Sequence, residues 1–162
     1  MSSTIIEKLY KKEPRFPKQY EYLFTAFSRK GGGSDEERKN KSKVFRNDYE
    51  FYMYAFFTGI RHKHRITNRS IVISKRKVWN IQNWQPQKLR DYMMSCVLVE
   101  AKIPLREYDF MNEKKLNEKS VELKDIIEEY THGGLSIIDG RYEEDRHYFN
   151  ETFAFTNFVF EK

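Results

Sequence analysis

The chain has 162 residues, of which 39% are hydrophobic and 33% are charged, and its formal net charge is +6. The 16% aromatic content supplies enough large rings for a folded core, which excludes a disordered chain. No apolar run approaches the roughly 20 residues that cross a bilayer, the first residues lack an apolar signal region, and the single Cys96 allows no internal disulfide. We therefore expect a cytoplasmic protein that does not bind membranes, folded as a single helical domain over 1–162.

Apolar spacing predicts helices from the start of the chain. Residues 4–12 form a short amphipathic piece, and Pro14 and Pro17 break the chain after it. Four apolar residues at i, i+3, i+4 and i+7 then predict a helix over 17–29. The glycine-rich stretch 31–42 contains no Gly-Lys-Ser/Thr, so we expect a flexible loop and not a phosphate-binding loop.

The central stretch joins an apolar helix to a basic segment. Residues 51–57 are apolar or aromatic at every position, which is typical of a helix that is buried on all sides. We expect this helix to begin near Ser42 and to end at Thr58, because Gly59 follows. Residues 41–77 carry ten Lys/Arg against two Asp/Glu, so the end of the helix should present cations at the surface.

Three further helices complete the prediction. One runs over 86–102, between two prolines, and has a clean apolar face. The next runs over 120–132, capped at its start by Asn117 or Ser120 and ended by the pair Gly133-Gly134, since glycine is the usual C-cap. The last runs over 141–160 and carries five phenylalanines. The fold class is therefore all-α, with about five to seven helices wrapped around the central one.

The stretch 68–74 leaves two alternatives open. Its Ile71-Val72-Ile73 run favours a strand, but a lone strand has no visible partner. We prefer a helical turn and retain a minor short strand pair near 68–82 as the alternative.

The basic segment, residues 61–77, is the candidate binding site. Its mixture of cations and small hydrogen-bond donors is of the kind that contacts nucleic-acid phosphates. Trp79, Trp84 or exposed tyrosines would stack on unpaired bases. The alternative is a solvated loop that pairs with residues 107–162, where fourteen Asp/Glu outnumber seven Lys/Arg. The predicted nucleic-acid-binding residues are Arg61, His62, Lys63, His64, Arg65, Arg69, Lys75, Arg76 and Lys77.

Metal and cofactor chemistry receives less support from the residues. His62 and His64 form an H-x-H pair, which places two imidazoles on one face of a strand and can hold zinc. A third ligand at a diagnostic spacing is missing, and the neighbouring cations repel a metal ion. We expect no metal and no cofactor.

One short motif suggests an enzyme. The stretch 97–102, Val-Leu-Val-Glu-Ala-Lys, resembles the second half of the E-x-K motif of the restriction-type metal-dependent nucleases. The resemblance implies that Glu100 helps to hold magnesium, that Lys102 assists the attacking water, and that Asp91 is the upstream carboxylate. The helical spacing of the same stretch instead makes Glu100 and Lys102 ordinary exposed charges.

Three functions follow from these observations. The first is a non-enzymatic nucleic-acid-binding or accessory subunit of a DNA- or RNA-processing assembly, which binds phosphates through the basic segment. The second is a protein-interaction module whose acidic C-terminal third binds a basic partner or a second copy of the chain. The third is the nuclease that uses Glu100 and Lys102.

Overall fold

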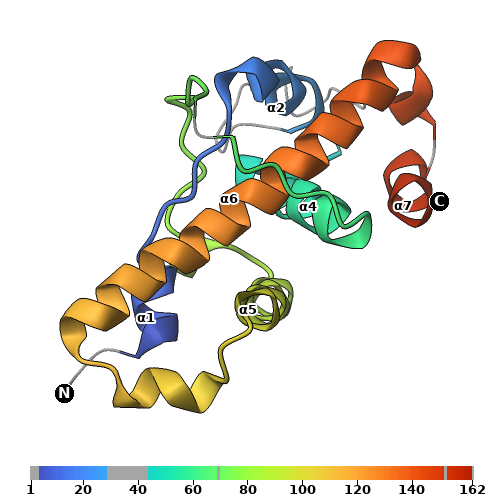
Figure 1. Ribbon diagram of the computed structural model, residues 1–162. Coiled ribbons are helices and arrows are strands. Elements are labelled where there is room, and N and C mark those ends of the chain that lie inside the picture. The colour runs from blue at the N-terminus through green and yellow to red at the C-terminus, as the bar shows by residue number, and fades with distance from the viewer. Residues whose placement is uncertain (1–3, 29–43, 69, 152, 162) are drawn as a thin grey trace. The chain divides into compact units, whose positions relative to one another are not determined.

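The computed structural model describes residues 4–28, 44–68, 70–151 and 153–161. Within these ranges the chain is all-α, as predicted, and irregular segments join its helices (Figure 1). The expected loop 31–42 lies outside the described residues. The expected start of the central helix near Ser42 is wrong, because residues 44–47 are not helical and α4 begins at Asp48. The helical elements are α1 (Ile5–Tyr10), η1 (Lys18–Tyr20), α2 (Glu21–Phe27), α4 (Asp48–Arg61), η2 (Ile81–Asn83), α5 (Gln87–Ala101), η3 (Leu105–Phe110), α6 (Glu113–Glu144), η4 (Tyr148–Asn150) and α7 (Ala154–Phe160). None of the described helices is long and apolar enough to cross a membrane.

The chain divides into two compact units with different charge. Unit 1 consists of 1–14 and 79–128, and unit 2 consists of 15–78 and 129–162. Unit 1 contains 11 Lys/Arg and 11 Asp/Glu, whereas unit 2 contains 19 and 13, so the whole net charge of +6 belongs to unit 2. The acidic C-terminal third is shared between the two units and therefore does not form a separate acidic body.

In unit 1, α5 is the helix that the two prolines predict. It begins after Pro86, and its buried face includes Met93 and Val97, which are fully shielded from solvent. The buried Arg90 donates to the backbone carbonyl of Gln82 at 3.0 Å, and its guanidinium lies 4.6 Å from the centre of the Tyr10 ring. These contacts fasten the start of α5 to the segments that precede it.

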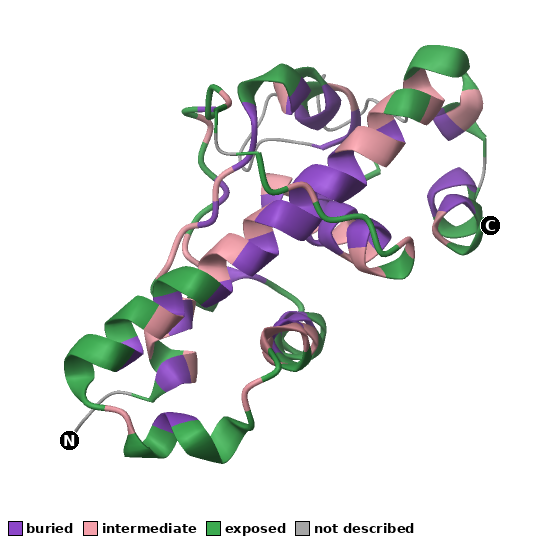
Figure 2. Cartoon of the chain, viewed as in Figure 1, coloured by how far each residue is buried: buried purple, intermediate pink, exposed green. Residues whose placement is uncertain are grey.

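In unit 2, α4 is the buried central helix that the sequence predicts. Most of its circumference is buried, but a stripe with Glu50, Tyr54 and Phe57 is only half-buried, so the helix is not buried on all sides as predicted. The buried residues, purple in Figure 2, are Tyr49, Phe51, Tyr52, Met53, Ala55, Phe56, Thr58 and Gly59. Burying large rings in this way removes a large apolar area from water, which is the main stabilising term of a core. The helix begins at Asp48 and ends at Arg61, so it continues past Thr58 and Gly59, where we expected it to stop.

The glycines of α4 and α6 mark a close crossing of the two helices. A Cβ atom added to Gly134 would lie 1.7 Å from the backbone oxygen of Ala55, and one added to Gly59 would lie 2.0 Å from that of Tyr130. A Cβ atom on Gly133 would lie 1.8 Å from the backbone oxygen of His64. Only glycine fits at these three positions, because the facing backbones occupy the space of a side chain.

This crossing corrects the predicted end of the helix over 120–132. Helix α6 runs without interruption for 32 residues from Glu113 to Glu144, and Gly133-Gly134 lie in its interior. It also starts earlier than predicted, because the Asn112 side chain accepts the Lys115 N–H at 2.8 Å and so acts as the N-cap in place of Asn117 or Ser120. Glycine costs about 1 kcal/mol in a helix relative to alanine, and here the close packing offsets that cost.

The predicted helix over 141–160 is also wrong. Its first residues belong to α6, a 3-10 turn covers Tyr148–Asn150, and α7 begins only at Ala154. Phe153 adopts a left-handed backbone conformation with φ of 67°, which interrupts any helix at that point. The phenylalanines therefore do not lie on one helix, and several of them pack between the end of α6, η4 and α7 instead.

Residues 68–74 form neither a helical turn nor a strand pair among the described residues. Ile73 makes an isolated antiparallel bridge with Pro17. The Lys18 N–H donates to the Val72 carbonyl at 2.8 Å, and the Ser74 N–H donates to the Phe16 carbonyl at 2.9 Å. The predicted helical turn was therefore wrong. The extended backbone bonds to residues 16–18, and this stretch contains Pro17 and has no alternating pattern from which a strand could be predicted.

Candidate nucleic-acid interface

Arg76 fastens the basic segment to the helices of unit 2. Its guanidinium donates to both carboxylate oxygens of Asp48 at 2.6 and 2.9 Å, and to the Thr25 hydroxyl at 2.9 Å. Both charged side chains are largely buried, with 14% of Arg76 and 10% of Asp48 exposed. Such a two-point pair is the strong form of an ion pair, and Asp48 also lies at the first residue of α4, where a carboxylate complements the helix dipole. Arg76 is thus engaged inside the fold.

Arg65 forms a second internal ion pair. Its Nε donates to the carboxylate of Glu129 at 2.7 Å, and its guanidinium lies 5.7 Å from the centre of the Tyr130 ring. The neighbouring Ile66 N–H donates to the Glu129 carbonyl at 3.1 Å. Glu129 belongs to the acidic C-terminal third, so this contact is of the kind that the solvated-loop alternative predicted.

The end of α4 turns the chain so that cations point outward. The His62 N–H donates to the Thr58 carbonyl at 3.1 Å, and the His64 N–H donates to the Gly59 carbonyl at 2.9 Å. Between them Lys63 has a positive φ of 53°, a left-handed conformation that ends a helix. Cations at a helix C-terminus also interact favourably with the helix dipole.

The remaining described Lys and Arg side chains of the segment, with His64, form two clusters. Arg61, Lys63 and His64 are exposed at the end of α4, and we call them the first cluster. Lys75 and Lys77 are exposed on either side of Arg76, and we call them the second cluster. None of these five side chains forms an ion pair with another described residue. Arg69, which the sequence also assigned to the site, lies outside the described residues.

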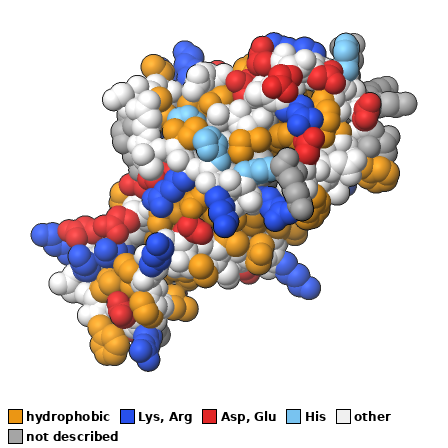
Figure 3. Space-filling model, turned by 45° about the vertical axis from the view of Figure 1, so that its right-hand side comes forward, with side chains coloured by type: hydrophobic (Ala, Val, Ile, Leu, Met, Phe, Trp, Pro, Cys, Tyr) orange, Lys and Arg blue, Asp and Glu red, His pale blue; other side chains and the backbone are white. Residues whose placement is uncertain are grey.

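The structure separates these clusters although the sequence joins them. Arg76 binds the first residue of α4 and Arg61 is its last residue, and a helix rises about 1.5 Å per residue, so the clusters lie about 20 Å apart. Figure 3 shows Lys and Arg side chains spread over the visible face, some side by side and others next to hydrophobic or acidic side chains. The segment therefore presents two separate cationic points and not one continuous patch.

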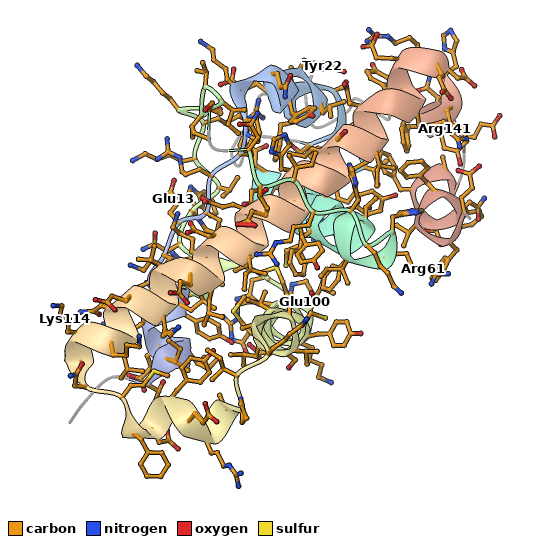
Figure 4. The ribbon with its side chains drawn as sticks, viewed as in Figure 1. Glu13, Tyr22, Arg61, Glu100, Lys114 and Arg141 are labelled. Carbon is orange, nitrogen blue, oxygen red and sulfur yellow. The ribbon has the colours of Figure 1, made fainter. Side chains whose placement is uncertain are left out.

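An exposed aromatic ring accompanies the first cluster. The Arg61 guanidinium lies 5.9 Å from the centre of the Phe160 ring, which is 67% exposed, and Figure 4 shows Arg61 at the end of α4 next to α7. The sequence analysis did not predict Phe160 as a stacking residue, because it assigned this residue to a long helix. It proposed Trp79 and Trp84 for that role, but Trp84 is fully buried and donates its indole N–H to the Trp79 carbonyl at 3.0 Å.

The histidines of unit 2 do not form a metal site with the other described residues. The described residues contain no group of three or more His, Cys, Asp or Glu that could hold a metal ion. The buried His132 contacts the Tyr20 ring edge to face, with the ring centres 5.7 Å apart. Burial lowers the pKa of His132 below its ordinary value, and the nearby His64 lowers it further.

The residues of the nuclease-like motif are placed on a helix and not on a strand. Glu100 lies on α5, where Figure 4 labels it, and the left-handed Lys102 forms the C-cap of that helix. Asp91 lies nine residues earlier on the same helix, which separates it from Glu100 by about 13 Å along the axis. A hydrogen bond from the Tyr10 hydroxyl lowers the pKa of Asp91, which keeps this carboxylate charged in a surface contact. The arrangement differs from the apolar strand that the resemblance implies.

No protein-family model, curated protein or solved structure matches this chain. The choice among the three functions therefore depends on the charge and geometry of unit 2.

Proposed function

We propose that the chain is a non-enzymatic nucleic-acid-binding protein or accessory subunit, which contacts phosphates through the two cationic clusters of unit 2. The observation that carries this proposal is the exposure of the basic segment's cations. Arg61, Lys63, Lys75 and Lys77 are exposed, as is His64, and none of these side chains forms an ion pair with another described residue.

The internal ion pairs give the segment the rigidity that phosphate binding needs. Arg65 and Arg76 hold its two ends against Glu129 and Asp48, so their charges are largely satisfied within the fold. The backbone that carries the neighbouring exposed cations is then fixed near these two pairs, and the exposed cations are not neutralised. A backbone that is fixed before binding loses little conformational entropy when its cations meet a phosphate. The predicted site is thus refined: Arg65 and Arg76 fix the segment, and the exposed residues contact the phosphates.

The spacing of the clusters suggests the length of nucleic acid required. Successive phosphates of one strand of a duplex are separated by about 3.4 Å along the axis, so a gap of about 20 Å covers roughly six nucleotides. An oligonucleotide that is much shorter engages one cluster at a time. We therefore expect affinity to rise steeply once the oligonucleotide exceeds this length.

The test is a salt titration of binding with labelled single- and double-stranded DNA and RNA. The variant replaces Arg61, Lys63, Lys75 and Lys77 by Ala together. Each neutralised phosphate contributes about 0.9 to the slope of log affinity against log salt for a duplex and about 0.7 for a single strand. The variant should therefore lose up to about 3.6 of that slope with duplex, with its melting curve unchanged, because all four side chains are exposed.

A matched control uses the electrically neutral unit 1. The control variant replaces one arginine and three lysines of unit 1 by Ala, the same numbers as in the test variant. All four are exposed, and they are Lys88, Arg106, Lys114 and Lys115. The control should bind nearly as well as the parent, since its charges lie outside the proposed site. Equal losses in the two variants would show that net charge alone governs binding. Absence of parent binding at low salt would contradict the proposal.

The protein-interaction function is the second candidate, and the exposed acids at the end of α6 favour it. Glu144 and Asp145 are exposed there, and among the described residues the Asp145 carboxylate accepts only the His147 N–H at 3.0 Å, whereas Glu143 accepts bonds from Arg146 at 2.8 Å and from the Tyr22 hydroxyl at 3.2 Å. A basic polypeptide such as polylysine is the suitable probe. If the parent binds polylysine and no nucleic acid, and substitution of Glu144 and Asp145 by Ala removes that binding, the second candidate replaces the first.

A further inference from the structure

We infer that Phe160 and Arg61 form a stacking site for an unpaired nucleobase, so that the ligand of unit 2 is a single strand. This inference rests on the proposed function and specifies the class of nucleic acid at the first cluster. It starts from the 67% exposure of the Phe160 ring and from the Arg61 guanidinium that lies 5.9 Å from its centre.

The position of Phe160 follows from the buried face of α7. Ala154, Phe155 and Phe158 are buried, and residues two positions apart on a helix point in nearly opposite directions. Phe160 therefore points away from the core that Phe158 enters. Because the ring is exposed, a ligand that covers it gains the roughly 25 cal/mol per Å² that burial of apolar area contributes.

The contacts of α7 hold this ring in place. The Tyr54 hydroxyl of α4 donates to the Phe155 carbonyl at 2.6 Å. Arg141 pairs with Glu161 at 2.7 Å, and its guanidinium also lies 5.5 Å from the centre of the Phe158 ring. The bonds of Phe155 and Glu161 lie before and after Phe160 in the sequence. They fix the backbone that carries the Phe160 ring before any ligand binds.

The chemistry of the pair matches a base with its phosphate. Nucleobases of single strands stack on aromatic rings and on the planar arginine guanidinium, and neither contact depends on the identity of the base. The exposed Lys63 lies two residues after Arg61 and can meet the adjoining phosphate. In a duplex the faces of the bases are covered by their neighbours, so the same pair has nothing to stack on.

The experiment compares Phe160→Ala with the parent on three probes of equal length, about 12 nucleotides. The probes are oligodeoxythymidine, the same backbone with abasic sites, and a mixed-sequence duplex. The variant should bind oligodeoxythymidine about 5- to 100-fold more weakly, which corresponds to the loss of one stacked base. Its affinity for the abasic strand and for the duplex should stay within about twofold of the parent, because the phosphate contacts are unchanged.

Phe110→Ala is the matched control, because Phe110 is 89% exposed and belongs to unit 1. It should leave all three affinities unchanged. Equal weakening of all three probes by Phe160→Ala, or an unchanged affinity for oligodeoxythymidine, would overturn the stacking inference while the phosphate-binding function stands. Failure of the parent to bind any probe at low salt would overturn the proposed function, and the inference with it.

Discussion

Replacing Gly134 by Ala should destabilise the protein, although alanine is the better helix former. The added Cβ would lie 1.7 Å from the Ala55 oxygen, and ordinary contact begins near 3.4 Å, so the two backbones must separate by more than 1.5 Å. Overpacking of a core costs about 1–3 kcal/mol when side chains can adjust, and here the obstacle is a backbone atom on another helix. We therefore take the upper end of that range, about 3 kcal/mol, and after the gain of about 1 kcal/mol in helix propensity we expect a net loss of about 2 kcal/mol.

Gly140 provides the control in the same helix. It lies on α6 six residues later, is exposed, and has no atom within 4 Å of an added Cβ. Gly140→Ala should therefore stabilise the protein by up to about 1 kcal/mol through helix propensity alone. Urea unfolding followed by circular dichroism measures both variants against the parent. If Gly134→Ala is as stable as Gly140→Ala, α4 and α6 do not cross as closely as the glycines indicate.

Three further predictions concern the core, the anchor and the buried histidine. Phe56→Ala should lower the free energy of unfolding by about 3–5 kcal/mol, because the ring is fully buried. Phe57→Ala should lower it clearly less, because that ring is partly exposed, and equal melting temperatures of the two variants would contradict this ranking. Arg76→Ala should lower the free energy of unfolding by about 3–5 kcal/mol, because the largely buried Asp48 loses the Arg76 guanidinium that pairs with it. If urea unfolds the variant and the parent alike, Arg76 does not anchor the segment. The folded chain resists protonation of His132, so stability should fall as pH drops below about 6.5, where the unfolded chain takes up the proton. His132→Gln should flatten that decline by at most about 1.4 kcal/mol per pH unit, and an unchanged slope between about pH 7.5 and 5.5 would exclude the histidine as its cause.

The sequence by itself determined the helices whose signals are local. Apolar spacing and the absence of any polar face predict α2 and α4, and two prolines bracket α5. These predictions succeed because the period of apolar residues and the stop at a proline depend only on neighbours a few positions away. The local signals also placed cations at the end of α4, since the basic run follows the apolar one directly.

Tertiary structure alone decided the length of α6 and the course of the basic segment. The pair Gly133-Gly134 has the local pattern of a helix end, yet α6 continues because the backbones of Ala55 and His64 need the space that a Cβ would fill. In the same way, Arg65 and Arg76 are indistinguishable from their neighbours in the sequence. They became anchors because Glu129 and Asp48, which lie 64 and 28 residues away in the chain, meet them in the fold. Residue spacing encodes contacts along one helix, whereas contacts between distant segments depend on how the helices pack, and that packing determines which cations remain exposed.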